Sequence, residues 1–184
     1  MKRRQASLFL PYQREIEALR LRHNPVQARL IPAHVTLCRE DEVTDWDAFR
    51  VRLESLSPFE ITLTFGAPVR EHDYVYLPIR EGLADYQHFR RTILLKDARK
   101  QTPHVTLIHP RNGTCNDRIF ADISATIISP FQFTFREVTL IEQENGGVWH
   151  VISRVGKSDD LESNAQSDEH SDAPKSPVGR EVQS

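Results

Sequence analysis

The sequence predicts an α+β fold made of two similar halves, which could face each other across a groove. The tetrapeptide HVTL occurs twice, at residues 34–37 and 104–107, each time inside a segment with the alternating pattern of a strand. The segments around the two copies follow the same order of strands and helices. This repetition indicates an internal duplication of an α+β unit.

The first half begins with a short apolar segment at 7–10, which favours a strand. Apolar residues at helical spacing predict a helix over 12–23, and Pro25 ends it. Residues 26–38 alternate and are rich in branched apolar side chains, so we expect one strand there with a bend at Pro32.

A second helix is expected after the first motif, because Thr44 or Asp45 can cap a segment, 46–56, whose apolar residues form one stripe. Residues 59–65 and 74–79 then resemble an antiparallel pair of strands joined by a polar turn. The first half therefore has the order strand, helix, motif strand, helix, strand.

The second half repeats this order from the strand at 74–79, and the turn sequence ENGG near its end is typical of a hairpin. The predicted elements are helices at 83–96 and 116–125 and strands at 104–109, 131–142 and 148–155.

The composition divides the 184 residues into a domain, 1–156, and an acidic tail, 157–184, which we expect to be disordered. The tail has seven acidic and three basic residues, a net charge of -4, so the domain carries about +2 of the whole chain's -2. This weak charge gives no general reason to expect duplex nucleic acid as a partner.

The low cysteine count and the lack of export or membrane-spanning patterns indicate the cellular location. Only Cys38 and Cys115 could form a disulfide, the N-terminus lacks the pattern of an export signal, and no apolar run approaches a membrane span. We therefore expect a cytoplasmic protein that does not associate with membranes.

Each HVTL copy presents one imidazole and one hydroxyl on the same face of its strand, because alternate residues of a strand share a face. His34 and Thr36 form one such pair, and His104 and Thr106 form the other. Two imidazoles with an ordinary pKa of about 6.5 can act as base and acid at a phosphate, while the hydroxyls donate to its oxygens. One such motif alone is typical of an ordinary half-buried histidine, but the repeat on matching strands favours a shared catalytic site.

The motifs His34-Val35-Thr36-Leu37 and His104-Val105-Thr106-Leu107 resemble the paired H-h-T-h motifs, with h apolar, of the 2H phosphoesterase superfamily. This superfamily includes the 2′-5′ RNA ligase and RNA 2′,3′-cyclic phosphodiesterase proteins, and the resemblance covers residues 5–156. The resemblance implies the LigT-like fold, an α+β fold in which two pseudo-symmetric lobes of antiparallel sheet with outer helices surround a central cleft. It also implies chemistry on 2′,3′-cyclic phosphates or 2′-5′ linkages without metal or cofactor. By the same resemblance the two histidines take the acid–base roles and the two threonines bind the phosphate.

Further substrate contacts are predicted near the motifs. Arg111 and Arg39 could bind a phosphate, although strict alternation turns Arg39 away from the groove, and Tyr12 could stack on a base. Cys38 has the parity of the motif histidine, but the duplicate position is an isoleucine, which favours a core role. His109 has the opposite parity to His104, which argues against a shared metal site.

We therefore expect a monomeric enzyme that hydrolyses the 2′,3′-cyclic phosphate of an RNA end or a small nucleotide to a 2′-monoester. Two alternatives remain open, namely 2′-5′ RNA ligation by the same groups in reverse, and a nucleotide- or RNA-binding module without turnover. A metal-dependent phosphodiesterase is disfavoured because the sequence has no zinc signature or Asp/His ligand cluster. The lack of a GxxxxGK[ST] motif disfavours ATP-dependent ligation.

Overall fold

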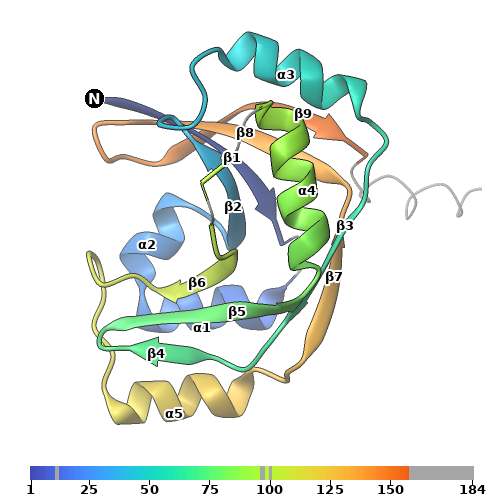
Figure 1. Ribbon diagram of the computed structural model, residues 1–184. Coiled ribbons are helices and arrows are strands. Elements are labelled where there is room, and N and C mark those ends of the chain that lie inside the picture. The colour runs from blue at the N-terminus through green and yellow to red at the C-terminus, as the bar shows by residue number, and fades with distance from the viewer. Residues whose placement is uncertain (11–12, 96–97, 100, 158–184) are drawn as a thin grey trace, which may run out of the picture.

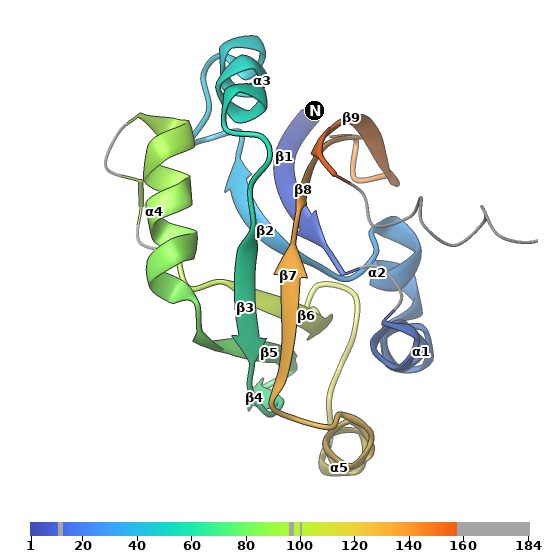
Figure 2. The same cartoon turned by 90° about the vertical axis from the view of Figure 1, so that its right-hand side faces the viewer.

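The computed structural model describes residues 1–10, 13–95, 98–99 and 101–157, which form nine strands and five helices. The strands make one strongly curved antiparallel sheet in the order β7-β3-β5-β6-β2-β1-β8-β9, with β4 paired to β5. The strands are β1 (Lys2–Phe9), β2 (His34–Arg39), β3 (Ile61–Phe65), β4 (Val69–Glu71), β5 (Tyr74–Glu81), β6 (His104–Ile108), β7 (Phe131–Phe135), β8 (Glu137–Glu144) and β9 (Trp149–Gly156). The helices are α1 (Arg14–His23), α2 (Pro25–Leu30), α3 (Trp46–Ser55), α4 (Leu83–Leu94) and α5 (Asp117–Thr126), and they lie outside the sheet (Figures 1 and 2).

The sheet consists of two lobes that meet at the motif strands; each has four strands in the main order, and β4 adds to β5 in lobe 2. Lobe 1 contains β2, β1, β8 and β9, and lobe 2 contains β6, β5, β3 and β7. The two motif strands pair antiparallel through a single residue pair, Val35 and Val105. In each lobe the motif strand also pairs with the first strand of its own half of the chain, β1 or β5. The predicted pseudo-symmetric lobes of antiparallel sheet are thus confirmed, and the two motifs lie side by side at their junction.

The outer strands are exchanged between the halves of the chain. The strand β3 belongs to the first half but lies in lobe 2 between β5 and β7, whereas β8 and β9 from the second half complete lobe 1. The predicted strand 131–142 is in fact two strands, β7 and β8, because Arg136 lies between them and they enter different lobes. Each lobe is therefore built from both halves of the sequence.

One predicted strand is partly a helix. Residues 26–38 were expected to be extended, but Pro25 begins α2 as its first residue, where a proline costs no hydrogen bond. Only His34–Arg39 is a strand. The alternating apolar residues of this segment also satisfy helical spacing, with Val26 and Leu30 four positions apart.

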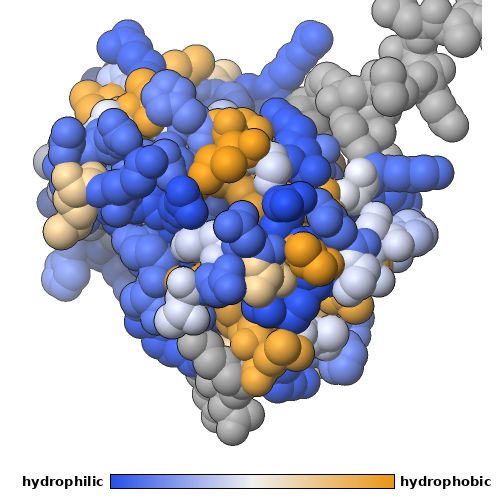
Figure 3. Space-filling model, turned by 90° about the horizontal axis from the view of Figure 1, so that it is seen from above, coloured by the Kyte–Doolittle hydropathy of each residue, from blue (hydrophilic) through white to orange (hydrophobic). Residues whose placement is uncertain are grey.

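The core lies between the sheet and the helices, and the largest fully buried side chains of the helices come from α3 and α4. Phe49 and Leu53 of α3 and Tyr86 and Ile93 of α4 are almost completely buried. Asp45 accepts hydrogen bonds from the first turn of α3, which confirms it as the cap. Apolar side chains on the face seen in Figure 3 form small, separate patches among hydrophilic ones.

Two expectations concern residues beyond the described part of the chain. Of the predicted tail, 157–184, only Lys157 is described, and Tyr12 also lies outside the described residues. Within the described part, no helix is both long enough and apolar enough to cross a bilayer.

Candidate functional site

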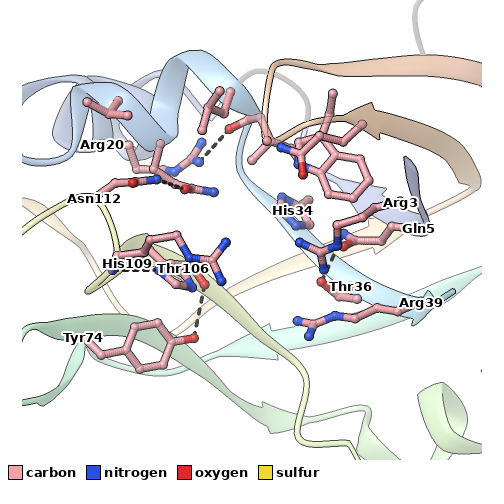
Figure 4. A pocket seen from close by; sticks show the side chains of 18 of the residues that line it. Arg3, Gln5, Arg20, His34, Thr36, Arg39, Tyr74, Thr106, His109 and Asn112 are labelled. Atoms are coloured by element: carbon pink, nitrogen blue, oxygen red, sulfur yellow. Dashed lines mark hydrogen bonds between the residues drawn. The ribbon is translucent and has the colours of Figure 1, made fainter. Parts of the chain in front are cut away.

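A pocket of about 410 Å³ lies at the junction of the two lobes, and the polar residues of both motifs line it. His34 and Thr36 reach it from β2, and His104 and Thr106 reach it from β6. Figure 4 shows that further polar side chains surround it: Arg3, Gln5 and Arg39 lie on one side, and Arg20, His109 and Asn112 lie on the other. The structure thus brings together the four residues that the sequence singled out.

The two motif histidines are held in the same tautomer. Nδ1 of His34 lies 2.8 Å from the carbonyl oxygen of Pro32, and Nδ1 of His104 lies 2.9 Å from that of Thr102. A carbonyl oxygen only accepts, so Nδ1 carries the proton in both rings. Nε2 is left as the atom of each ring that can take up or release a proton.

Partners at Nε2 distinguish the two rings. Nε2 of His104 lies 2.6 Å from the Tyr74 hydroxyl, whereas Nε2 of His34 has no hydrogen-bond partner among the described residues. Burial lowers the pKa of His34 to about 4, and the nearby charge of Arg20 acts in the same direction. Burial also lowers the pKa of His104, and Arg39 adds to the effect. Without an anion in the pocket, both rings are neutral near pH 7.

The two threonines form hydrogen bonds with residues at equivalent positions of the two lobes. Nε2 of Gln5 on β1 donates to Oγ1 of Thr36 at 3.2 Å, and the Tyr74 hydroxyl on β5 lies 3.2 Å from Oγ1 of Thr106 (Figure 4). No sequence pattern pointed to Gln5 or Tyr74. Their roles depend on strand pairing. Thr36 pairs with the residue two positions after Gln5, and Thr106 pairs with the residue two positions after Tyr74.

The prediction that Arg39 points away from the groove was wrong, because a β-bulge in β2 turns this side chain into the pocket. Ala6 pairs with Cys38 and Ser7 pairs with Thr36, so Leu37 is an extra residue in β2. Leu37 and Cys38 consequently both face the core, and Arg39 reaches the pocket instead of pointing away from it. The same shift removes Cys38 from the face of His34, and burial raises the pKa of its thiol. This agrees with the core role favoured for Cys38.

The second motif has a bulge at the equivalent residue. Val75 pairs with Ile108 and Tyr76 pairs with Thr106, so Leu107 is the extra residue in β6. His109 therefore lines the same pocket as the motif histidines, although strict alternation placed it on the opposite face. The available signal was the pair of adjacent apolar residues that follows the threonine of each motif, Leu37-Cys38 and Leu107-Ile108.

The pocket is strongly cationic. Among the described residues that line it, none carries a carboxylate and four are arginines, namely Arg3, Arg20, Arg39 and Arg111. Arg3 is paired with Glu40 and Arg20 with Glu17, both of which lie outside the lining. Arg39 and Arg111, predicted as substrate contacts, have no ion-pair partner in the described part of the chain. The pocket therefore suits an anionic ligand.

A metal centre has no evident ligands here. Within the described ranges, no group of three or more histidine, cysteine or acidic side chains is arranged to hold a metal ion. The pocket itself offers imidazoles, hydroxyls and guanidinium groups, which suit a phosphate.

A family model described as the 2'-5' RNA ligase superfamily matches residues 9–147. The chain therefore belongs to this superfamily, that of the 2H phosphoesterases. No protein in a search of curated sequences matches it.

Solved structures have the same fold. The apo form of E. coli LigT matches with a TM-score of 0.56 and 20% identity, covering 84% of this chain and 96% of that chain. A crystal structure of a phosphoesterase matches with a TM-score of 0.56 and 18% identity, covering 85% and 98%. The protein TT0787 of Thermus thermophilus matches with a TM-score of 0.52 and 15% identity, covering 84% and 97%. E. coli LigT has also been crystallised with phosphate and with 3'-AMP.

Proposed function

We propose that the protein hydrolyses 2′,3′-cyclic phosphates, on RNA ends or small nucleotides, to 2′-phosphomonoesters. The observation that carries this proposal is the pair of motif imidazoles in one cationic pocket, with equivalent tautomers and inequivalent partners at Nε2. Membership of the 2'-5' RNA ligase superfamily supports the class of substrate. The ligands of E. coli LigT, phosphate and 3'-AMP, are of the same chemical kind.

His34 is proposed as the general base, because its pKa is lowered to about 4 and its Nε2 is free to accept a proton. Nε2 takes a proton from water, and the water oxygen attacks phosphorus. The bond from phosphorus to O3′ breaks, and Nε2 of the protonated His104 gives its proton to O3′. The phosphate remains on O2′. His34 has gained one proton from water, and His104 has lost one proton to O3′.

The substrate itself supplies the charge that this mechanism needs. Burial and Arg39 keep His104 neutral when the pocket is empty. A bound phosphate brings a negative charge between the arginines, which favours the imidazolium and raises the pKa of the ring. Thr36 and Thr106 donate to the non-bridging oxygens, where charge grows in the transition state. Arg39 and Arg111 provide further positive charge at the same place.

We also propose that the enzyme needs no metal and acts as a monomer in the cytoplasm. Both cysteines of the chain are unpaired, which supports a reducing compartment. The reverse reaction, 2′-5′ ligation, would use the same two histidines with their roles exchanged, and a non-catalytic binding module is the remaining alternative.

The test is turnover of the four nucleoside 2′,3′-cyclic monophosphates in excess EDTA, with 2′- and 3′-products resolved. His34→Ala and His104→Ala should each lower turnover by about 10²–10⁴-fold, whereas His88→Ala on the exposed face of α4 should not. Near-wild-type turnover in either motif variant would contradict the paired site. Binding of nucleotides without any turnover would favour the binding module.

A further inference from the structure

One row of side chains in lobe 1 extends the pocket beyond the motif residues. Arg3 on β1 pairs with Gln143 on β8, and Gln143 pairs with Trp149 on β9. Residues directly opposite one another on neighbouring strands project to the same face of a sheet. All three accordingly line the pocket, together with Gly146 of the β8–β9 turn.

Several contacts hold this row in place. The Arg3 guanidinium lies 5.8 Å from the ring centroid of Trp149, within the range of a cation–π contact, and its Nε donates to Glu40 at 2.9 Å. Gln143 is 6% exposed, and its Nε2 donates to the carbonyl oxygen of Gly147 at 2.6 Å. The Arg3 guanidinium therefore lies near the indole of Trp149, and the buried Gln143 occupies the strand position between these two residues before any ligand binds.

Apolar side chains of α2 line the same pocket. Val26 and Leu30 are four residues apart, so they lie on one face of this helix. Val26 is 51% exposed, so its side chain is accessible to a ligand in the pocket. The pocket thus has an aromatic surface and an apolar surface in addition to its cationic centre.

This arrangement breaks the two-fold symmetry of the site. Gln5 and Tyr74 are equivalent, so the counterpart of Arg3 in lobe 2 is His72, two residues before Tyr74. His72 lies in the turn between β4 and β5, with φ of 56°. Because the chain turns back there, the described part of lobe 2 has no row that matches Arg3, Gln143 and Trp149. The aromatic side chain that lines the pocket from lobe 2, Tyr74, is instead hydrogen-bonded to His104.

We propose that the row Arg3, Gln143 and Trp149 is a nucleobase subsite, in which the base attached to the reacting ribose phosphate stacks on the Arg3–Trp149 pair. This rests on the proposed function, and it narrows the substrate to nucleotides whose base is next to the cyclic phosphate. Stacking on an aromatic ring or a guanidinium accepts any base, since every base has a π-face. The site therefore selects for a base without selecting among the four.

The direct test uses the fluorescence of Trp149. The chain has two tryptophans, and Trp46→Phe leaves Trp149 as the only one. Adenosine 2′-monophosphate should quench its emission, because stacking brings the base against the indole. Inorganic phosphate should compete with the nucleotide for the pocket without quenching by itself. An equal change in emission from phosphate and from the nucleotide would overturn the proposal.

A second test separates this subsite from the catalytic chemistry. Trp149→Ala should lower kcat/KM for adenosine 2′,3′-cyclic phosphate by about 5- to 100-fold, the value expected for one stacked base. It should leave kcat/KM unchanged for 1-O-methylribose 2,3-cyclic phosphate, which has no base. Trp149→Phe keeps an aromatic ring and should retain most of the activity.

The outcomes of this second test are distinguishable. Equal losses for both substrates, or no loss for either, would overturn the nucleobase subsite while leaving the hydrolase intact. If the wild-type protein hydrolyses neither substrate, the proposed function fails, and the fluorescence titration then decides by itself whether a base binds at Trp149.

Discussion

The pKa of His34 predicts how the stability of the protein responds to pH. In the folded state burial and the charge of Arg20 hold this pKa near 4, whereas an unfolded histidine has a pKa of about 6.5. Below pH 6.5 the unfolded chain therefore binds a proton that the folded chain does not. The contribution of the neutral His34 ring to the free energy of unfolding is therefore fully present above about pH 6.5. It is lost as the pH falls toward 4.

The size of the effect follows from the two pKa values. For values of about 6.5 and about 4, the free energy of unfolding falls by about 2 kcal/mol between pH 7.5 and pH 5. The side chain is partly exposed, so solvent screening reduces the expected loss to about 1–2 kcal/mol. His34→Gln removes this titration but keeps a polar side chain of similar size.

The assay is urea unfolding of the wild type and of His34→Gln at both pH values. Between pH 7.5 and pH 5, the free energy of unfolding of the wild type should fall by about 1–2 kcal/mol more than that of His34→Gln. His88→Gln, at an exposed position on α4, is the control for histidine loss in general. A difference that is the same at both pH values would show that His34 titrates normally, and the assignment of His34 as the base would lose its electrostatic support.

Two further outcomes are expected. Tyr74→Phe removes the hydrogen bond to Nε2 of His104 but keeps the hydrogen bond that fixes Nδ1. Turnover should therefore fall only about 2- to 10-fold. A loss as large as that of His104→Ala would mean that the Tyr74 hydroxyl itself transfers the proton. Arg90→Met leaves the buried Glu42 with only a 3.9 Å contact to Arg99 and should lower the free energy of unfolding by about 3–5 kcal/mol in urea. Arg50→Ala, which breaks an exposed pair with Glu54 on α3, should cost less than about 1 kcal/mol. Equal losses in the two variants would contradict this account.

The sequence was sufficient for features that depend on local patterns. The HVTL repeat predicted that His34 and His104 would share a site, and the cap at Asp45 and the hairpin before Trp149 were found where expected. Each of these features is contained in a short run of residues, which a single sequence records directly.

Features that depend on distant pairing were missed or wrong. The exchange of outer strands places β3 in lobe 2, and no residue of β3 itself carries that information. The row Arg3, Gln143 and Trp149 joins the first strand of the chain to its last two. Only the register of the assembled sheet places them on one face.

The bulges explain both why strict alternation failed and how the core supports the site. An extra residue in a strand leaves backbone groups without partners in the ladder, and buried groups of this kind need other partners. In lobe 1 they come from α4, because the Tyr86 hydroxyl donates to the carbonyl oxygen of Thr36 and Nε of Arg90 donates to that of Leu37 at 2.7 Å. Arg90 is completely buried and is itself held by Glu42. The buried charge on α4 thus stabilises the irregularity that turns Arg39 into the pocket, so a residue that never contacts substrate helps to determine the electrostatics of the site.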